Sequence, residues 1–244
     1  MDTQTRHALK QDSFVQATAS SISWVEAHRS TLIKASIAIV VLVGLFFAGL
    51  ITYNNRSEHA EVLFGRAMDI YNTPLTVPGQ PAEPGAKTYA TAADRAKAAN
   101  PLFEEVANNY SWFKAGANAR YLAGMTALDM GQSSTGEKDL KQAADSSDRS
   151  VAALAKFALA GLYHQTSRDP QAIELYQQLI AKPAATVPTS MAKLQLAALY
   201  ETTKPEEAKK IYAEIKDQDK ATAAGQIATQ KLQGPNAPPP APGR

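Results

Sequence analysis

Four histidines and two pairs of adjacent glutamates are the side chains whose types could support acid–base or metal chemistry in this sequence. None of the histidines belongs to a pair at metal-binding spacing: His7, His28, His59 and His164. The glutamates at 104–105 and 206–207 are adjacent, so on a helix their carboxylates point about 100° apart instead of converging as in a hydrolase. We interpret both pairs as solvated helix faces. The sequence therefore predicts no catalytic or metal site and no enzyme.

Composition excludes several further kinds of chemistry. The 244 residues include no cysteine, which excludes disulfides, thiolate metal sites and a cysteine nucleophile. The glycines match neither common phosphate-binding pattern, so no cofactor is expected. Lysine and arginine number 25 against 23 acidic residues, and a formal net charge of +2 provides no broad field to attract nucleic acid. With 45% apolar residues, the chain can bury a sizeable core.

The elements that carry these residues are predicted to be helices. Beyond residue 54 the chain has no alternating β-branched runs, and few turn residues interrupt its long segments. The tetrads Leu-Ala-Gly-Met, Leu-Ala-Gly-Leu and Leu-Ala-Ala-Leu begin at 122, 159 and 196, a spacing of 37 residues. A second apolar-periodic segment follows each tetrad. We expect an all-α solenoid of three to four hairpins, because a single hairpin cannot bury both of its apolar faces.

The residue types within each unit explain how such hairpins would pack. The alanines of the three tetrads are small enough to let two antiparallel helices approach closely. Tyr163 and Tyr200, one turn later, provide bulk where the two helices diverge. In the turn between helices, we expect Asp169 to cap a helix that has Pro170 at its first position.

At these positions the chain resembles the tetratricopeptide repeat (TPR) family, whose pattern is Leu-Ala/Gly-x-x-Tyr followed by Ala-x-x-x-Phe/Tyr. Two repeats follow this pattern: Leu159, Ala160, Tyr163, Ala172 and Tyr176, then Leu196, Ala197, Tyr200, Ala208 and Tyr212. The preceding repeat departs from it, with Thr126 at the tyrosine position and Gly136 near the alanine position. The resemblance covers residues 102–232 and implies a TPR-like fold and a non-enzymatic, protein-binding role.

An uncharged apolar run at residues 35–53 predicts one transmembrane helix. A bilayer core requires about 20 residues of helix, and the run is close to this length. Tyr53 lies at its end, where interfacial aromatic residues are typical. A cleaved signal peptide is the alternative, but 34 residues precede the run and no clear A-x-A site follows it. The flanking basic residues are balanced, so we place the N-terminus in the cytoplasm because a long trailing domain can translocate regardless of its charge.

We divide the chain into four segments. Residues 1–34 form a cytoplasmic tail with an amphipathic helix at 12–33, and residues 35–53 form the span. Residues 54–232 form the repeat domain, with a Pro- and Gly-rich insertion at 73–91 and a capping helix at 222–232. Residues 233–244 form a disordered, Pro-rich tail.

The TPR-like register places one set of residues from the first helices on a concave, partner-binding groove. The set is Ala117, Arg120, Gly124, Leu154, Phe157, Gly161, His164, Gln165, Met191, Leu194, Ala198 and Glu201. Most of these residues are apolar or small, which suits an extended peptide or an amphipathic helix as the partner. The alternative is that the chain's own capping helix fills the groove. A general-base role for His164 would require a partner that the sequence gives no reason to place there.

The order of tail, pre-membrane helix, span and short repeat array resembles the bacterial inner-membrane TPR proteins that serve as ancillary Sec translocon subunits and periplasmic chaperones. This resemblance implies a single-pass protein of the inner membrane whose periplasmic repeat domain binds newly exported polypeptides. The first alternative is a structural or assembly subunit of another envelope complex, in secretion, pilus or outer-membrane biogenesis. The second, an enzyme accessory or weak hydrolase, would need a converging acid, base or metal-ligating cluster that the sequence does not show.

Overall fold

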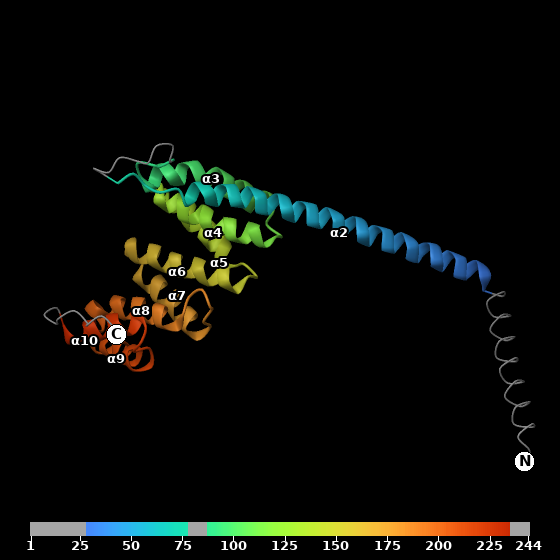
Figure 1. Cartoon of the computed structure of the whole chain (residues 1–244). Coiled ribbons are helices and arrows are strands. Elements are labelled where there is room, and N and C mark those ends of the chain that lie inside the picture. Colours follow the sequence, from blue (N-terminus) through green and yellow to red (C-terminus); the bar gives the residue numbers. More distant parts are fainter. Residues whose placement is uncertain (1–27, 78–86, 235–244) are drawn as a thin grey trace, which may run out of the picture. The chain divides into compact units, whose positions relative to one another are not determined.

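The architecture consists of α-helices joined by short turns (Figure 1). The computed structural model describes residues 28–77 and 87–234, and these residues form nine α-helices and no named strand. The chain divides into two compact units, Met1–Arg56 and Ser57–Arg244. The all-α prediction is therefore confirmed. Most of the helix predicted at 12–33 and nearly all of the tail predicted at 233–244 lie outside the described residues.

Helix α2, Arg29–Tyr71, begins in the first unit and ends in the second. It contains an 18-residue window of mean hydropathy 2.6, none of it buried, so the helix is long and apolar enough to cross a membrane. The run predicted to be the span does not form a helix of its own. Residues 54–59 contain no proline or glycine that would end a helix, and α2 continues through them.

In the second unit, the C-terminal part of α2 packs against α3, Ala92–Asn109. The ring of Phe103 lies 5.9 Å from that of Phe64 and 6.0 Å from that of Tyr71, measured between centroids. Helix α3 begins where the side chain of Thr91 accepts a hydrogen bond from the backbone of the first turn. These aromatic contacts form the centre of the core cluster at this end of the unit.

The ends of the insertion predicted at 73–91 lie together between α2 and α3. The backbone N–H of Thr76 donates to the carbonyl of Tyr89 at 2.8 Å, and the N–H of Tyr89 donates to the carbonyl of Pro74 at 3.1 Å. Residues 78–86 lie outside the described residues. Because the ends meet, the insertion leaves the packing of the two helices intact.

Three helical hairpins and a final helix follow α3. They are α4 (Lys114–Asp129) with α5 (Ser133–Ala144), α6 (Arg149–Gln165) with α7 (Asp169–Ala181), α8 (Thr189–Thr203) with α9 (Pro205–Gln218), and α10 (Ala223–Gln233). Each helix packs against the next, and α4 also contacts α6. The predicted solenoid of stacked hairpins, closed by a C-terminal capping helix, is therefore the observed fold.

The residues that carry the repeat pattern lie in the core. Tyr163 and Tyr200 are buried, and so are the alanines at the pattern positions of the first and second helices: Ala123, Ala160, Ala197, Ala172 and Ala208. A cation lies over each tyrosine ring, with the guanidinium carbon of Arg168 at 4.3 Å from the Tyr163 centroid and Nζ of Lys204 at 5.0 Å from that of Tyr200. Both tyrosines therefore fill the space between the paired helices, as their spacing predicts.

The two departures from the repeat pattern have physical reasons in the packing of α4. Thr126 is fully buried, and its hydroxyl accepts a hydrogen bond from Nδ2 of Asn100 at 2.9 Å, so α3 supplies a polar partner where other repeats have a tyrosine. A Cβ on Gly136 would lie 2.5 Å from the Leu128 side chain and 3.0 Å from the carbonyl of Gly124. Glycine at this position therefore lets α5 approach α4 closely.

The prediction that Asp169 caps α7 is wrong. Arg168 is the N-cap residue and makes no side-chain capping bond, and Asp169 is the first residue of the helix. Ser167 adopts a left-handed φ of 58°, and Arg168 follows it directly at the cap position. The Asp169 carboxylate instead lies 2.8 Å from Nδ1 of His164. At this position its charge still favours the positive end of the helix dipole.

Candidate partner-binding surface

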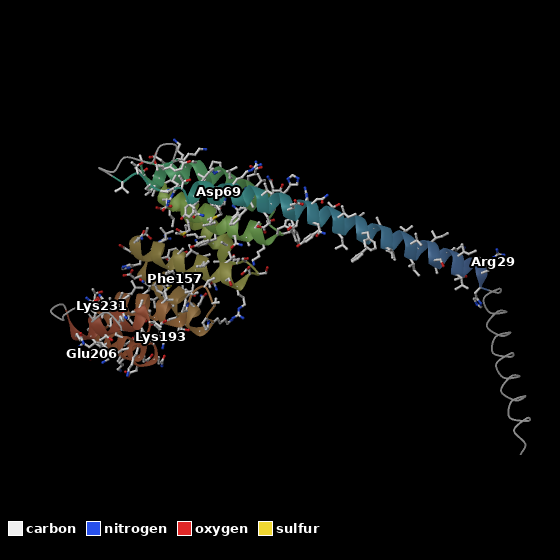
Figure 2. All side chains as sticks on the ribbon, in the orientation of Figure 1. Arg29, Asp69, Phe157, Lys193, Glu206 and Lys231 are labelled. Carbon is white, nitrogen blue, oxygen red and sulfur yellow. The ribbon has the colours of Figure 1, made fainter. Side chains whose placement is uncertain are left out.

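We use the term first-helix row for the eight residues whose size or polarity could bind a partner. They are Arg120, Leu154, Phe157, His164, Gln165, Met191, Leu194 and Glu201, and they come from α4, α6 and α8. Figure 2 labels Phe157 on α6 among the side chains of the second unit. The row divides into apolar side chains that pack on the core, side chains exposed to solvent, and charged side chains held by other helices.

Leu154, Phe157 and Leu194 are half-buried and pack against the main core cluster. The Phe157 ring meets that of Tyr176 on α7 edge-on, at a centroid distance of 5.7 Å and an interplanar angle of 68°. Such contacts stabilise the hairpin itself. One face of each of these side chains therefore lies against the hairpin interior.

The exposed members of the row are Met191, with 44% of its surface accessible, the adjacent residues His164 and Gln165 on α6, and Glu201. The His164 ring pairs with Asp169, a contact that no local pattern predicts, because a turn separates the two residues. Both side chains are about half exposed, so this pair lies in water and lacks the desolvated surroundings of a catalytic dyad. The pair presents a polar, exposed group at the C-terminal end of α6, whereas Met191 lies in the first turn of α8.

Arg120 is held within the repeat array by two carboxylates. Its Nη1 lies 3.0 Å from Asp139 Oδ1 on α5 and 3.2 Å from Glu104 Oε2 on α3, and its other terminal nitrogen donates to Asn108. Side-chain exposures of 16% for Arg120, 28% for Glu104 and 4% for Asp139 make this a largely buried network. The sequence interpretation of Glu104 as part of a solvated face is therefore wrong, because α4 and α5 cover it.

Burial raises the pKa of Asp139, and the nearby Glu104 carboxylate raises it further, while Arg120 opposes the shift. Asp139 Oδ2 has no hydrogen-bond partner among the described residues. The signal available in the sequence was limited to Glu104 and Asn108, four residues apart on one helix face. Nothing local to Arg120 indicated that α3 and α5 would supply its partners.

Glu201 is paired at the C-terminal end of the array. It accepts a hydrogen bond from the Tyr212 hydroxyl at 2.7 Å and lies 2.9 Å from Nζ of Lys231 on α10. These two contacts lower the pKa of Glu201, and burial raises the pKa of Tyr212. The three residues line a hollow of about 510 Å³ between α8, α9 and α10. The capping helix thus engages one end of the first-helix row.

Several acidic residues of the array take part in ion pairs between helices. Within residues 28–77 and 87–234, no three histidine, aspartate or glutamate side chains are grouped so as to hold a metal ion. The pKa of Glu137 on α5 is lowered to about 2, and the cause is hydrogen bonding to Arg168 and then to Lys141. That shift belongs to an ion pair between repeats, which fits a structural role.

The paired helices, the buried tyrosines and the small residues at the helix crossings define the second unit as a TPR-like α-solenoid. No protein-family model and no curated protein matches the chain. Among solved structures, the chain is similar to a kinesin light chain from Podosopora anserina with nearly identical TPR-like repeats. The identity is 16%, the match covers 57% of this chain and 76% of that one, and the TM-score is 0.48.

Proposed function

We propose that this protein is a membrane-anchored adaptor of the bacterial cell envelope whose repeat array binds polypeptides, in association with the Sec translocon and newly exported chains. The observation that carries the proposal is the presence on one chain of an unburied helix long enough to span a bilayer and a stacked array of helical hairpins. A solenoid of this kind exposes a continuous row of side chains from successive helices, which suits binding more than catalysis.

The chemistry of the exposed row supports an extended or helical peptide as the partner. Met191 provides a flexible apolar contact, and thioether side chains adapt to many partner shapes. Gln165 and the His164–Asp169 pair add hydrogen-bonding groups at the C-terminal end of α6. Arg120 and Glu201 are both occupied by contacts within the array, so a partner with a terminal carboxylate would find no free arginine from this row.

A fixed subunit of another envelope assembly is the second candidate. The observation that favours it is the capping helix, because Lys231 on α10 already engages Glu201 at one end of the row. A binding surface that is partly occupied at one end suits one permanent partner more than many different exported chains.

Site-specific photo-crosslinking in living cells tests both candidates. A benzophenone side chain would replace Gln165 or Met191 in the full-length protein, and the exposed Glu174 and Lys210 on second helices serve as matched controls. The proposal predicts crosslinks to Sec components and exported chains from the first two positions, at yields well above those from the controls, because only the first-helix positions would contact the bound chain.

Each outcome assigns or rejects a function. One stoichiometric partner without Sec components selects the alternative assembly subunit. Equal yields from first and second helices reject the first-helix row as the binding surface. An alkaline phosphatase fused after Leu232 should be active in cells, since the proposed orientation places the repeats outside the cytoplasm. An inactive fusion would reject that orientation.

A further inference from the structure

Trp112 is the most exposed large apolar side chain of the repeat unit, with 93% of its surface accessible. It lies in the turn that joins α3 to α4, between Ser111 and Phe113. Burial of a tryptophan ring removes a large apolar area from water, which is energetically favourable. A nearly fully exposed ring on a folded surface therefore indicates a binding site.

The turn that carries Trp112 is held firmly against α4. The backbone N–H of Phe113 donates to the carbonyl of Tyr110 at 3.0 Å. A Cβ on Gly116 would lie 2.0 Å from that carbonyl oxygen, so only glycine lets the turn pack on the first turn of α4. The Trp112 ring is therefore presented on a fixed backbone, which lowers the entropy lost when it binds.

A second turn of the same design shows that this backbone does not require tryptophan. Between α9 and α10, the N–H of Thr222 donates to the carbonyl of Asp219 at 2.9 Å. A Cβ on Gly225 would lie 2.2 Å from that carbonyl, which matches the role of Gly116. The position equivalent to Trp112 is occupied by Ala221. Trp112 thus serves a purpose other than forming its turn.

The packing of α2 on α3 fixes where Trp112 lies along the repeat unit. Arg95 stacks on Tyr71 at 5.1 Å, and Phe103 contacts Phe64. Helix α3 therefore runs antiparallel to the C-terminal part of α2. The same pairing places the end of α3, just before Trp112, opposite Ser57, where the chain enters the unit. Trp112 is therefore at the tethered end.

The tether is short on the scale of a membrane interface. Ser57 follows the last residue of the apolar run, Tyr53, by four residues, which is about 6 Å of helix. The headgroup region on each side of a bilayer is about 5–7 Å thick. A tryptophan ring near Ser57 can therefore reach the headgroups, the region in which tryptophan is enriched in membrane proteins.

We propose that Trp112 inserts into the lipid headgroup region of the membrane that holds residues 35–53, as a second contact of the repeat unit with the bilayer. This inference rests on the proposed membrane anchoring. The indole N–H remains hydrogen-bonded among headgroups while the ring covers its apolar surface. The neighbouring Lys114 is exposed and adds attraction to anionic lipids. The α3–α4 turn would then restrict how the repeat array rotates above the membrane.

Fluorescence of the full-length protein in liposomes of phosphatidylcholine and phosphatidylglycerol tests the proposal. Trp24→Phe leaves Trp112 as the single tryptophan of the chain. Lipids brominated near the top of the acyl chains should reduce Trp112 emission by about half, and iodide should quench it weakly, because the ring lies at the interface. The matched control carries Trp24→Phe, Trp112→Phe and Ala221→Trp, which moves the tryptophan to the equivalent turn at the other end of the array.

The control tryptophan should be quenched by iodide and unaffected by brominated lipid. If the reporter at 112 behaves like the reporter at 221, the proposal is overturned. Weak quenching of Trp112 by both iodide and brominated lipid would also overturn the proposal, because the ring would then be covered by protein. This measurement is made at one chain per liposome. Removal of the protein from the liposomes by an alkaline wash would instead reject the anchoring itself, which keeps the two failures apart.

Discussion

The two halves of the repeat unit reach the same hairpin geometry with different chemistry. In α6–α9, alanines and tyrosines at the pattern positions fill the space between helices, and the core there is almost wholly apolar. In α3–α5, the equivalent positions hold Thr126 and Gly136, and Arg120 with its two carboxylates lies at the junction of three helices. The first half of the array therefore adds polar contacts to its apolar core.

A repeat can therefore lack the pattern residues when side chains of a neighbouring helix provide alternative contacts. Asn100 and Glu104 both come from α3, which belongs to the preceding pair of helices. The polar half is thus stabilised in part by side-chain contacts that α3 supplies to α4, whereas the apolar half belongs to one apolar cluster that extends over all of its hairpins. The two halves should respond differently to substitution and to pH.

Removal of a pattern tyrosine should have the largest effect. Tyr163→Ala or Tyr200→Ala should lower the free energy of unfolding by roughly 3–5 kcal/mol, because each truncation leaves a cavity in a buried site. Urea unfolding of the full-length protein in mild detergent measures this change. The matched control is Thr126→Ala at the same register position, expected to cost about 1 kcal/mol. Equal losses of unfolding free energy for Tyr163→Ala and Thr126→Ala would show that the two halves do not differ in this way.

Removal of the cation at the centre of the polar half should rank second. Arg120→Met should cost roughly 2 kcal/mol at pH 7, less than for a fully buried pair because Glu104 is 28% exposed. The pKa of Asp139 is already raised, and loss of Arg120 raises it further. Acidification then protonates the buried carboxyl, so the difference from wild type should shrink as the pH falls. Unfolding measured at pH 7 and pH 4 checks this, and a gap that widens on acidification would contradict it.

The contact between the halves should show the smallest effect. Glu137 on α5 accepts from Arg168 at 2.8 and 3.1 Å, and Arg168 covers the Tyr163 ring. Glu137→Gln should cost about 1 kcal/mol or less at neutral pH, because the pair is partly solvated. The lowered pKa of about 2 means that this contribution is complete above about pH 4.5 and disappears as the pH falls toward 2.

Unfolding curves across that pH range distinguish this contact from a general acid effect. Glu105→Gln on the exposed face of α3 provides the control and should leave the unfolding free energy unchanged within about 0.5 kcal/mol. A cost of Glu137→Gln that is constant from pH 7 to pH 2 would show that the ion pair contributes nothing and that the two halves are joined by apolar packing alone.

Local sequence patterns were sufficient to predict the helices, the 37-residue period and the buried tyrosines and pattern alanines of the last two hairpins. Each of these follows from local periodicity, since residues three or four apart share a helix face and a repeated unit must stack to bury its apolar surface. The apolar run was equally readable, because its length and lack of charge are properties of one continuous segment.

Contacts that join separate helices could be established only from the folded arrangement. The partners of Arg120, the pairing of His164 with Asp169 across a turn, and the packing of Phe157 on Tyr176 depend on crossing distances that no local pattern encodes. The position of Trp112 follows from the antiparallel packing of α3 on α2. Sequence periodicity shows which face of a helix is apolar. Which side chains of two helices touch depends on how those helices pack against each other.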